Sequence, residues 1–210
     1  MDAVASVARP RRHRPWATAT LLAVLVGVAV GALTFVGQRF LPGQWNTLVN
    51  SGAIWLVPVF FVGSRMRSLP WAAAAGVATL LATLAGYYVP YTLAGTPKSL
   101  FYVALWVGVA LIAGPLFGMA GCAWRSDRRM HRVVGVAMLG GVLATEGLYL
   151  VIVLGYLWSG WSMVVAGVVA DVVLSSRGDR LLTLAVSPLP IAAAGLAYAA
   201  VNWLGTFNRL

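Results

Sequence analysis

The chain has 210 residues, of which 60% are hydrophobic and 10% charged, with a formal net charge of +10. Its mean hydropathy is +0.86, and several apolar runs reach the roughly 20 residues that a helix needs to cross a hydrocarbon core of about 30 Å. These values exclude a soluble protein, and the unbroken apolar runs exclude a membrane β-barrel, whose strands alternate in polarity. We therefore expect an all-α integral membrane protein.

Seven membrane-spanning helices are predicted in residues 16–210, after a basic arm at residues 1–15. The first helix is typical of a signal anchor, because its apolar region is too long for a cleaved signal peptide and no clear small-residue cleavage site follows. The sixth is the shortest, because Asp171 interrupts it. The predicted spans are 16–37, 46–64, 70–90, 99–122, 133–156, 160–175 and 181–205.

The positive charge follows the predicted topology. Twelve of the fifteen basic residues lie in the arm or in the loops after the second, fourth and sixth helices, and three lie on the other side. This distribution predicts a cytoplasmic N-terminus and an outside C-terminus in a plasma-membrane protein, and it argues against nucleic acid as a partner. The twelve are Arg9, Arg11, Arg12, Arg14, Arg65, Arg67, Arg125, Arg128, Arg129, Arg132, Arg177 and Arg180.

Small residues indicate where helices approach each other closely. Gly27 and Gly31 form a GxxxG pattern in the first helix, and the fourth helix repeats a small residue on each turn at Gly114 and Gly118. Such stripes favour close helix packing in membranes, and we expect contacts within one chain. Cys122 is the sole cysteine, so an intramolecular disulfide and a cysteine-based metal site are excluded.

Two acidic residues fall at membrane depth. Glu146 lies in the apolar segment LATEGLYLVIVLGYLWSGW, and Asp171 lies nearer the cytoplasmic side, where partial hydration is an equal alternative. A charge at the centre of a membrane helix costs about 3 kcal/mol, and no Lys or Arg is predicted at the same depth. We expect each carboxyl to be a neutral acid that can donate a proton, with structural hydrogen bonding as the alternative for Glu146.

Further polar and aromatic residues are candidates for substrate contact. Asn50, one turn inside the second helix, favours substrate contact and helix–helix bonding equally, whereas Thr79 and Thr83 favour hydrogen bonds to their own helix. Glu146, Tyr149 and Tyr156 are predicted on one face of the fifth helix. Most aromatic residues fall in the outer half, which predicts an aromatic-lined cavity. The candidate substrate-binding residues are Asn50, Trp55, Tyr87, Tyr88, Trp106, Tyr149 and Tyr156.

A neutral acid in a dry aromatic cavity suits protonation of a carbon–carbon double bond. Aromatic ring faces stabilise the resulting carbocation, and exclusion of water prevents its premature capture. A second polar group then accepts the final proton. Glu146 and Asp171 are the candidate catalytic residues.

The sequence resembles the small integral-membrane terpene cyclases in its size, its seven predicted helices and its few acids among many aromatic residues. It is most similar to the bacterial branch that cyclises farnesylated cyclodipeptides in drimentine-type biosynthesis, and its EGLYL segment is similar to uncharacterised actinobacterial membrane proteins. The resemblance implies proton-initiated cyclisation of a prenyl chain without cofactor or metal. It implies a prenylated small molecule and the lipid bilayer as partners, with no obligate protein partner.

The sequence also departs from this pattern. Fungal members of the class carry their key acids on the second and last helices, where this chain has Asn50 and no acid, respectively. If the activity is shared, Glu146 or Asp171 must supply the proton. The alternative function is a small-molecule-binding subunit of a membrane transporter, in which Glu146 would face an open polar cavity instead of a closed apolar one.

Overall fold

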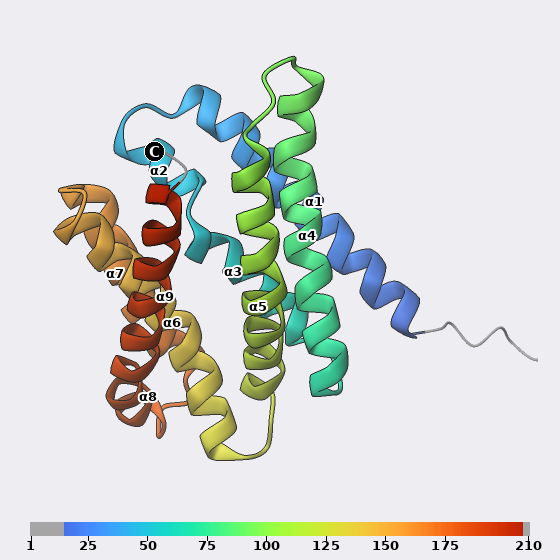
Figure 1. Ribbon diagram of the computed structural model, residues 1–210. Coiled ribbons are helices and arrows are strands. Elements are labelled where there is room, and N and C mark those ends of the chain that lie inside the picture. The colour runs from blue at the N-terminus through green and yellow to red at the C-terminus, as the bar shows by residue number, and fades with distance from the viewer. Residues whose placement is uncertain (1–14, 208–210) are drawn as a thin grey trace, which may run out of the picture.

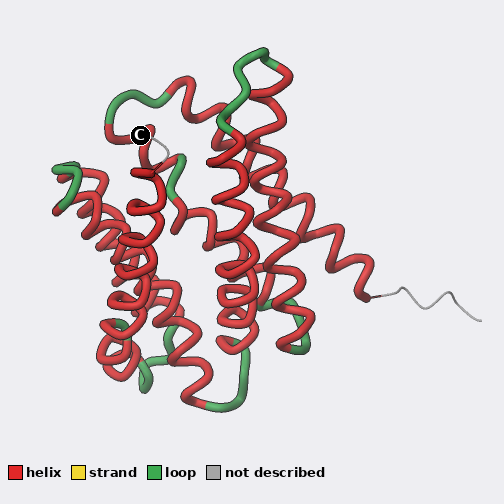
Figure 2. The backbone as a smooth tube through the Cα atoms, viewed as in Figure 1, coloured by secondary structure: helices red, strands yellow, loops and turns green. Residues whose placement is uncertain are grey.

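The computed structural model describes residues 15–207, which form nine helices and no strand (Figures 1 and 2). The predicted basic arm lies outside the described residues except for Pro15. The helices are α1 (Pro15–Phe40), α2 (Gln44–Val49), α3 (Gly52–Gly63), α4 (Leu69–Leu93), α5 (Leu100–Trp124), α6 (Arg129–Ile152), α7 (Leu157–Leu174), α8 (Arg180–Val186) and α9 (Pro188–Phe207).

Seven segments of the described chain are long and apolar enough to cross a membrane. Five are single helices, whereas Gln44–Gly63 combines α2 with α3, and Arg180–Ala197 combines α8 with the start of α9. The predicted all-α fold with seven spans is therefore confirmed, and the chain is a multi-pass membrane protein. Many large apolar side chains on its surface are exposed, as expected of helices that face lipid.

Three predicted helices differ from the observed ones, because each meets a local break. The second is interrupted at Asn50 and Ser51, and the last is interrupted at Ser187, just before Pro188. Pro188 has no N–H to donate to the Leu184 carbonyl, so the helical hydrogen bonds are interrupted there, although Ser187 keeps helical φ and ψ of −54° and −29°. The predicted fifth helix ends at Ile152, and Gly155 turns the chain with a φ of 69°.

The small-residue stripes lie where helix backbones meet. α4 packs between α1 and α5. A Cβ at Gly31 would overlap the α4 backbone at Thr83, and a Cβ at Gly118 would overlap the α4 backbone at Ala72. The prediction that these stripes pack within one chain is confirmed. Thr83 also donates to the Thr79 carbonyl at 2.9 Å, which confirms bonding within its own helix.

The loops α3–α4, α5–α6 and α7–α8 lie at one end of the helix bundle, at the bottom of Figure 1. Together with the first turns of α6 and α8, they carry eight of the twelve arginines considered above. We call this the arginine-rich end. There Asp179 pairs with Arg129 at 2.6 Å and with Arg132 at 3.2 Å, so the loop before α8 is fastened to the start of α6. α6 is the most buried of the seven spans and carries Glu146 near its opposite end.

Candidate functional site

Glu146 lies on the buried side of α6, and its carboxylate contacts the first turn of α3. The residue is 5% exposed, and Oε2 accepts a hydrogen bond from the Ala53 N–H at 2.6 Å. Ala53 is the second residue of α3, so the carboxylate satisfies one of the N–H groups that a helix start leaves without an intrahelical partner. The positive end of the helix dipole also favours an acidic acceptor. Glu146 therefore caps a helix that starts within a membrane-spanning segment.

The backbone at this interruption finds further side-chain partners. Ser51 Oγ accepts from the Ile54 N–H at 3.1 Å, and the Thr34 hydroxyl of α1 lies 3.1 Å from the Val49 carbonyl that ends α2. Trp55 Nε1 in turn donates to Thr34 Oγ1 at 3.1 Å. Backbone groups in a membrane must be satisfied internally. The break is thus held by side chains from α1, α3 and α6.

Four of the predicted substrate-binding residues form one packed cluster around α3, α4 and α5. The ring centroid of Trp55 lies 5.7 Å from that of Tyr87 and 5.9 Å from that of Trp106, and Tyr87 lies 4.9 Å from Tyr88. Tyr87 also donates its hydroxyl to Gln38 Oε1 at 2.7 Å. These rings pack against one another. They line neither of the two pockets described below.

Asn50 and Tyr156 both lie at helix ends. Asn50 is the exposed C-cap of α2, so its predicted position inside a continuous helix is wrong. Tyr156 is the N-cap of α7, and its N–H donates to the Leu150 carbonyl at 2.8 Å. The predicted shared helical face of Glu146 and Tyr156 is also wrong, because α6 ends at Ile152. Their proposed contacts with substrate stay predictions.

An apolar pocket of about 550 Å³ lies between α6 and α9. Among its described lining residues, the oxygen-bearing side chains are those of Thr145 and Tyr149, which flank Glu146 along α6. The Thr145 hydroxyl lies 2.8 Å from the Gly141 carbonyl and 3.2 Å from the Ile191 carbonyl, so it bridges the two helices at the pocket. The lining consists of Thr145, Leu148, Tyr149, Ile152, Val153, Ile191, Gly195 and Ala199.

Asp171 of α7 is buried between α6 and the α8–α9 junction. The residue is 3% exposed, and Oδ2 lies 2.5 Å from the Ser187 hydroxyl. A Cβ at Gly140 would overlap the carboxyl group, so the absence of a side chain on α6 makes room for the acid. The alternative of partial hydration is therefore not supported by this burial. This burial could not be predicted from the sequence, because Gly140, which leaves room for the carboxyl, lies on another helix.

The two acids lie at different heights along the axis of α6, although only Glu146 belongs to that helix. Asp171 packs against Gly140, whereas Glu146 is six residues further along, a rise of about 9 Å. Among the described residues, no group of three His, Cys, Asp or Glu side chains could hold a metal ion. The arrangement offers two carboxyl groups: that of Glu146 is bound to the start of α3, and that of Asp171 is bound to the Ser187 hydroxyl.

Sequence reasoning missed the buried hydroxyls beside Asp171. Ser187, Thr183 and the loop residue Ser175 are all buried, and Thr183 Oγ1 lies 2.8 Å from Ser175 Oγ. Asp179, Thr183 and Ser187 recur at four-residue spacing, which places them on one helical face. That spacing was a usable signal in the sequence.

Fold and site define an all-α multi-pass membrane protein in which Glu146 and Asp171 are buried within membrane-spanning segments. Residues 10–205 match a family of unknown function (DUF6518), and the chain belongs to this family. No curated protein and no solved structure matches the chain.

Proposed function

We propose that the protein is a membrane-embedded enzyme that protonates and cyclises a prenyl chain, as in the terpene cyclases that its sequence resembles. The observation that carries the proposal is the pocket of about 550 Å³ between α6 and α9. Its described lining is almost wholly apolar and includes Thr145 and Tyr149, one residue before and three residues after the buried Glu146.

The pocket suits a hydrocarbon chain better than a polar metabolite. Its volume lies within the range of about 300–1,000 Å³ that is typical of small-molecule sites. Six of its eight lining residues have no side-chain oxygen or nitrogen, so they offer a prenyl chain contact without competing polar groups. Because α6 and α9 belong to membrane-spanning segments, a lipid-soluble substrate can reach this level from the bilayer.

The proposed reaction conserves atoms. A carboxylic acid gives its proton to a double bond of the prenyl chain, a second double bond attacks the carbocation to close a ring, and loss of a proton elsewhere restores neutrality. The product is an isomer of the substrate. Glu146 and Asp171 are the candidate acids, and Tyr149 is the aromatic residue that both lines the pocket and lies one turn from Glu146.

The proposal includes a location. The arginine-rich end faces the cytoplasm and the membrane is the plasma membrane, because basic loops remain on the cytoplasmic side during insertion. A prenylated cyclodipeptide is the proposed substrate, on the strength of the resemblance.

The test uses membranes that contain the full chain, incubated with a farnesylated cyclodipeptide and analysed by liquid chromatography and mass spectrometry. We expect a new peak of unchanged mass. Loss of a general acid commonly costs about 10²–10⁴-fold in rate, so Glu146→Gln or Asp171→Asn should reduce the peak by such a factor. Asp127→Asn is the matched control, because Asp127 is an exposed loop carboxyl.

Two results would reject the enzyme proposal. One is an isomer peak that survives in both acid variants at the level of the control. The other is the lack of any isomer from a panel of prenylated substrates, combined with tight binding of a small polar metabolite, which favours the transport alternative.

A further inference from the structure

Asp171 is the one carboxyl in the described chain with an unsatisfied buried oxygen. Its Oδ1 has no hydrogen-bond partner among the described residues and lies against Gly140. No described Lys, Arg or His nitrogen lies within ion-pair distance of it, since both ion pairs found there involve Asp179. An ionised carboxylate in such a place is costly unless it is paired.

The number of hydrogen atoms available around Ser187 also favours the neutral, protonated form of Asp171. Ser187 Oγ lies 2.5 Å from Asp171 Oδ2 and 2.9 Å from the Thr183 carbonyl. A serine hydroxyl has one hydrogen, and neither a carbonyl nor an ionised carboxylate can supply another. If Asp171 is neutral, its own hydrogen bridges to Ser187, and Ser187 donates to Thr183. Only the neutral acid makes both contacts full hydrogen bonds.

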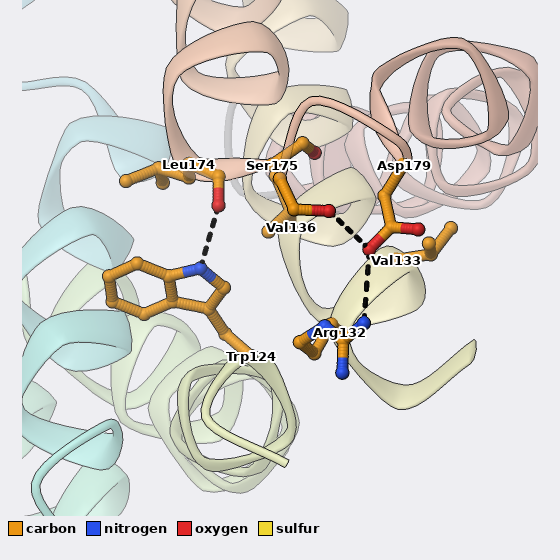
Figure 3. Close-up of a pocket in the computed structure, with 8 residues that line it drawn as sticks. Trp124, Arg132, Val133, Val136, Leu174, Ser175 and Asp179 are labelled. Carbon is orange, nitrogen blue, oxygen red and sulfur yellow. Dashed lines mark hydrogen bonds and ion pairs between the residues drawn. The ribbon is translucent and has the colours of Figure 1, made fainter. Parts of the chain in front are cut away.

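Two further buried hydroxyls, those of Thr183 and Ser175, lie beyond this pair toward the arginine-rich end, and Ser187 contacts Thr183 through its backbone carbonyl. Thr183 Oγ1 lies 3.0 Å from the Asp179 carbonyl, to which it can donate, and 2.8 Å from Ser175 Oγ. Ser175 in turn lines a pocket of about 310 Å³ at that end (Figure 3). Ser175 therefore connects this pocket to Thr183, which lies on the same helical face as Ser187.

The pocket itself is polar at its rim and well ordered by its own contacts. Figure 3 shows Trp124 donating to the Leu174 carbonyl, at 2.9 Å, and Arg132 directed at Asp179. These bonds tie α5 to the end of α7, and α6 to the loop before α8. The α7–α8 loop lines this pocket, whose volume is large enough for several water molecules.

The charged groups on the neighbouring elements are engaged elsewhere. On α6, Arg129 and Arg132 bind Asp179, and Glu146 binds the α3 terminus. On α8, Arg180 Nε donates to the Val172 carbonyl at 3.0 Å, next to Asp171 in sequence. The remaining titratable side chains on these elements are His131, which is exposed at the start of α6, and Tyr149 near its end.

We propose that Asp171 is a proton-binding site that is neutral in the resting protein and exchanges its proton through the Ser187 hydroxyl, on the side that faces the arginine-rich end. The ligand of this site is a proton. The proposal does not depend on any substrate. Should the protein be a cyclase, the same site identifies Asp171 as the acid that is reloaded from the arginine-rich end, while Glu146 holds α3.

The experiment is infrared spectroscopy of the full chain in lipid bilayers at pH 7, with and without ¹³C at the aspartate side-chain carboxyl. The chain has four aspartates, at positions 2, 127, 171 and 179, so a protonated aspartate signal has few possible sources. We expect an isotope-sensitive band of a protonated carboxyl that Asp171→Asn removes and Glu146→Gln retains. Isotope labelling of the unmodified protein gives an answer even if Asp171→Asn does not fold.

The exchange route is tested by transfer into D₂O. We expect the band to shift as the proton is replaced, and we expect Ser187→Ala to slow this shift by about tenfold, the factor that corresponds to about 1.4 kcal/mol. Absence of a protonated aspartate at pH 7, or its persistence in Asp171→Asn, would overturn the site. Exchange at the same rate in Ser187→Ala would overturn the route.

Discussion

At the scale of single residues, Glu146 and Asp171 share burial but differ in what surrounds them. Glu146 accepts a backbone N–H at the start of α3, a contact that requires an acceptor oxygen and no proton. Asp171 contacts a hydroxyl through one oxygen and leaves the other without a described partner. The expectation that both are neutral acids treated them alike, because hydropathy registers depth and not hydrogen-bond partners.

The cap formed by Glu146 leads to a prediction about stability. Glu146→Ala should lower the free energy of unfolding by about 1–3 kcal/mol, because the buried Ala53 N–H loses its acceptor. Glu146→Gln should cost less, since its amide oxygen can still accept. Thermal or denaturant unfolding in detergent measures both. Equal losses in the two variants would show that the negative charge, and not the acceptor, is what α3 requires.

At the scale of helices, two interruptions determine where functional groups can lie. The break between α2 and α3 turns a helix start toward Glu146, and the break before α9 brings Ser187 to Asp171. In both places the partner comes from a distant part of the chain, 93 residues away for Ala53 and Glu146. A broken helix in a membrane persists only where such partners satisfy its freed backbone groups.

A second contact between elements has a pH signature. Hydrogen bonds from Arg129, Ser176 and Arg132 lower the pKa of Asp179 to about 2, so the ionised form fastens the α7–α8 loop to α6. Its unfolded-state pKa is about 3.9. Because the folded pKa is lower, the stabilisation is complete above about pH 4 and is lost as the pH falls toward 2.

The corresponding measurement compares the unmodified protein with Asp179→Asn in thermal unfolding from pH 7 to pH 2. We expect the variant to melt at a lower temperature at pH 7 and the difference to vanish near pH 2. A difference that stays constant over this range would show that the charge of Asp179 does not fasten the loop.

At the scale of the whole molecule, charge is separated along the bundle. The three loops of the arginine-rich end and the helix starts that follow them carry eight arginines. The loop at residues 94–99 carries only Lys98, whose ammonium lies 4.1 Å from the Tyr91 ring centroid. The apolar pocket opens between α6 and α9, and the polar pocket lies at the arginine-rich end. The molecule therefore presents an apolar pocket and a pocket lined in part by charged and hydroxyl side chains, at different positions along α6.

Membrane orientation is predicted from the arginines and can be measured directly. In a Cys122→Ser background, Thr96→Cys should react with a membrane-impermeant maleimide in intact cells, because position 96 is exposed at the end opposite the arginines. Asp127→Cys, exposed at the arginine-rich end, should react only after the membrane is opened. The reverse labelling pattern would invert the proposed topology.

Hydropathy by itself determined that the chain is all-α, that it has seven spans and that Glu146 and Asp171 are the acids at membrane depth. These properties depend on runs of neighbouring residues, and burial of the backbone in lipid permits few alternatives to a helix. Small residues such as Gly31 and Gly118 likewise marked the packing faces, because close approach needs the absence of a side chain whatever the partner.

Only the tertiary structure decided what each polar residue contacts. The breaks at Ser51 and Ser187, the cap at Glu146 and the space for Asp171 beside Gly140 all depend on pairs of residues far apart in sequence. Hydrogen bonds extend about 3 Å and overlap of atoms begins at similar distances. Such short-range interactions are set by how helices pack, and no pattern within one helix contains that information.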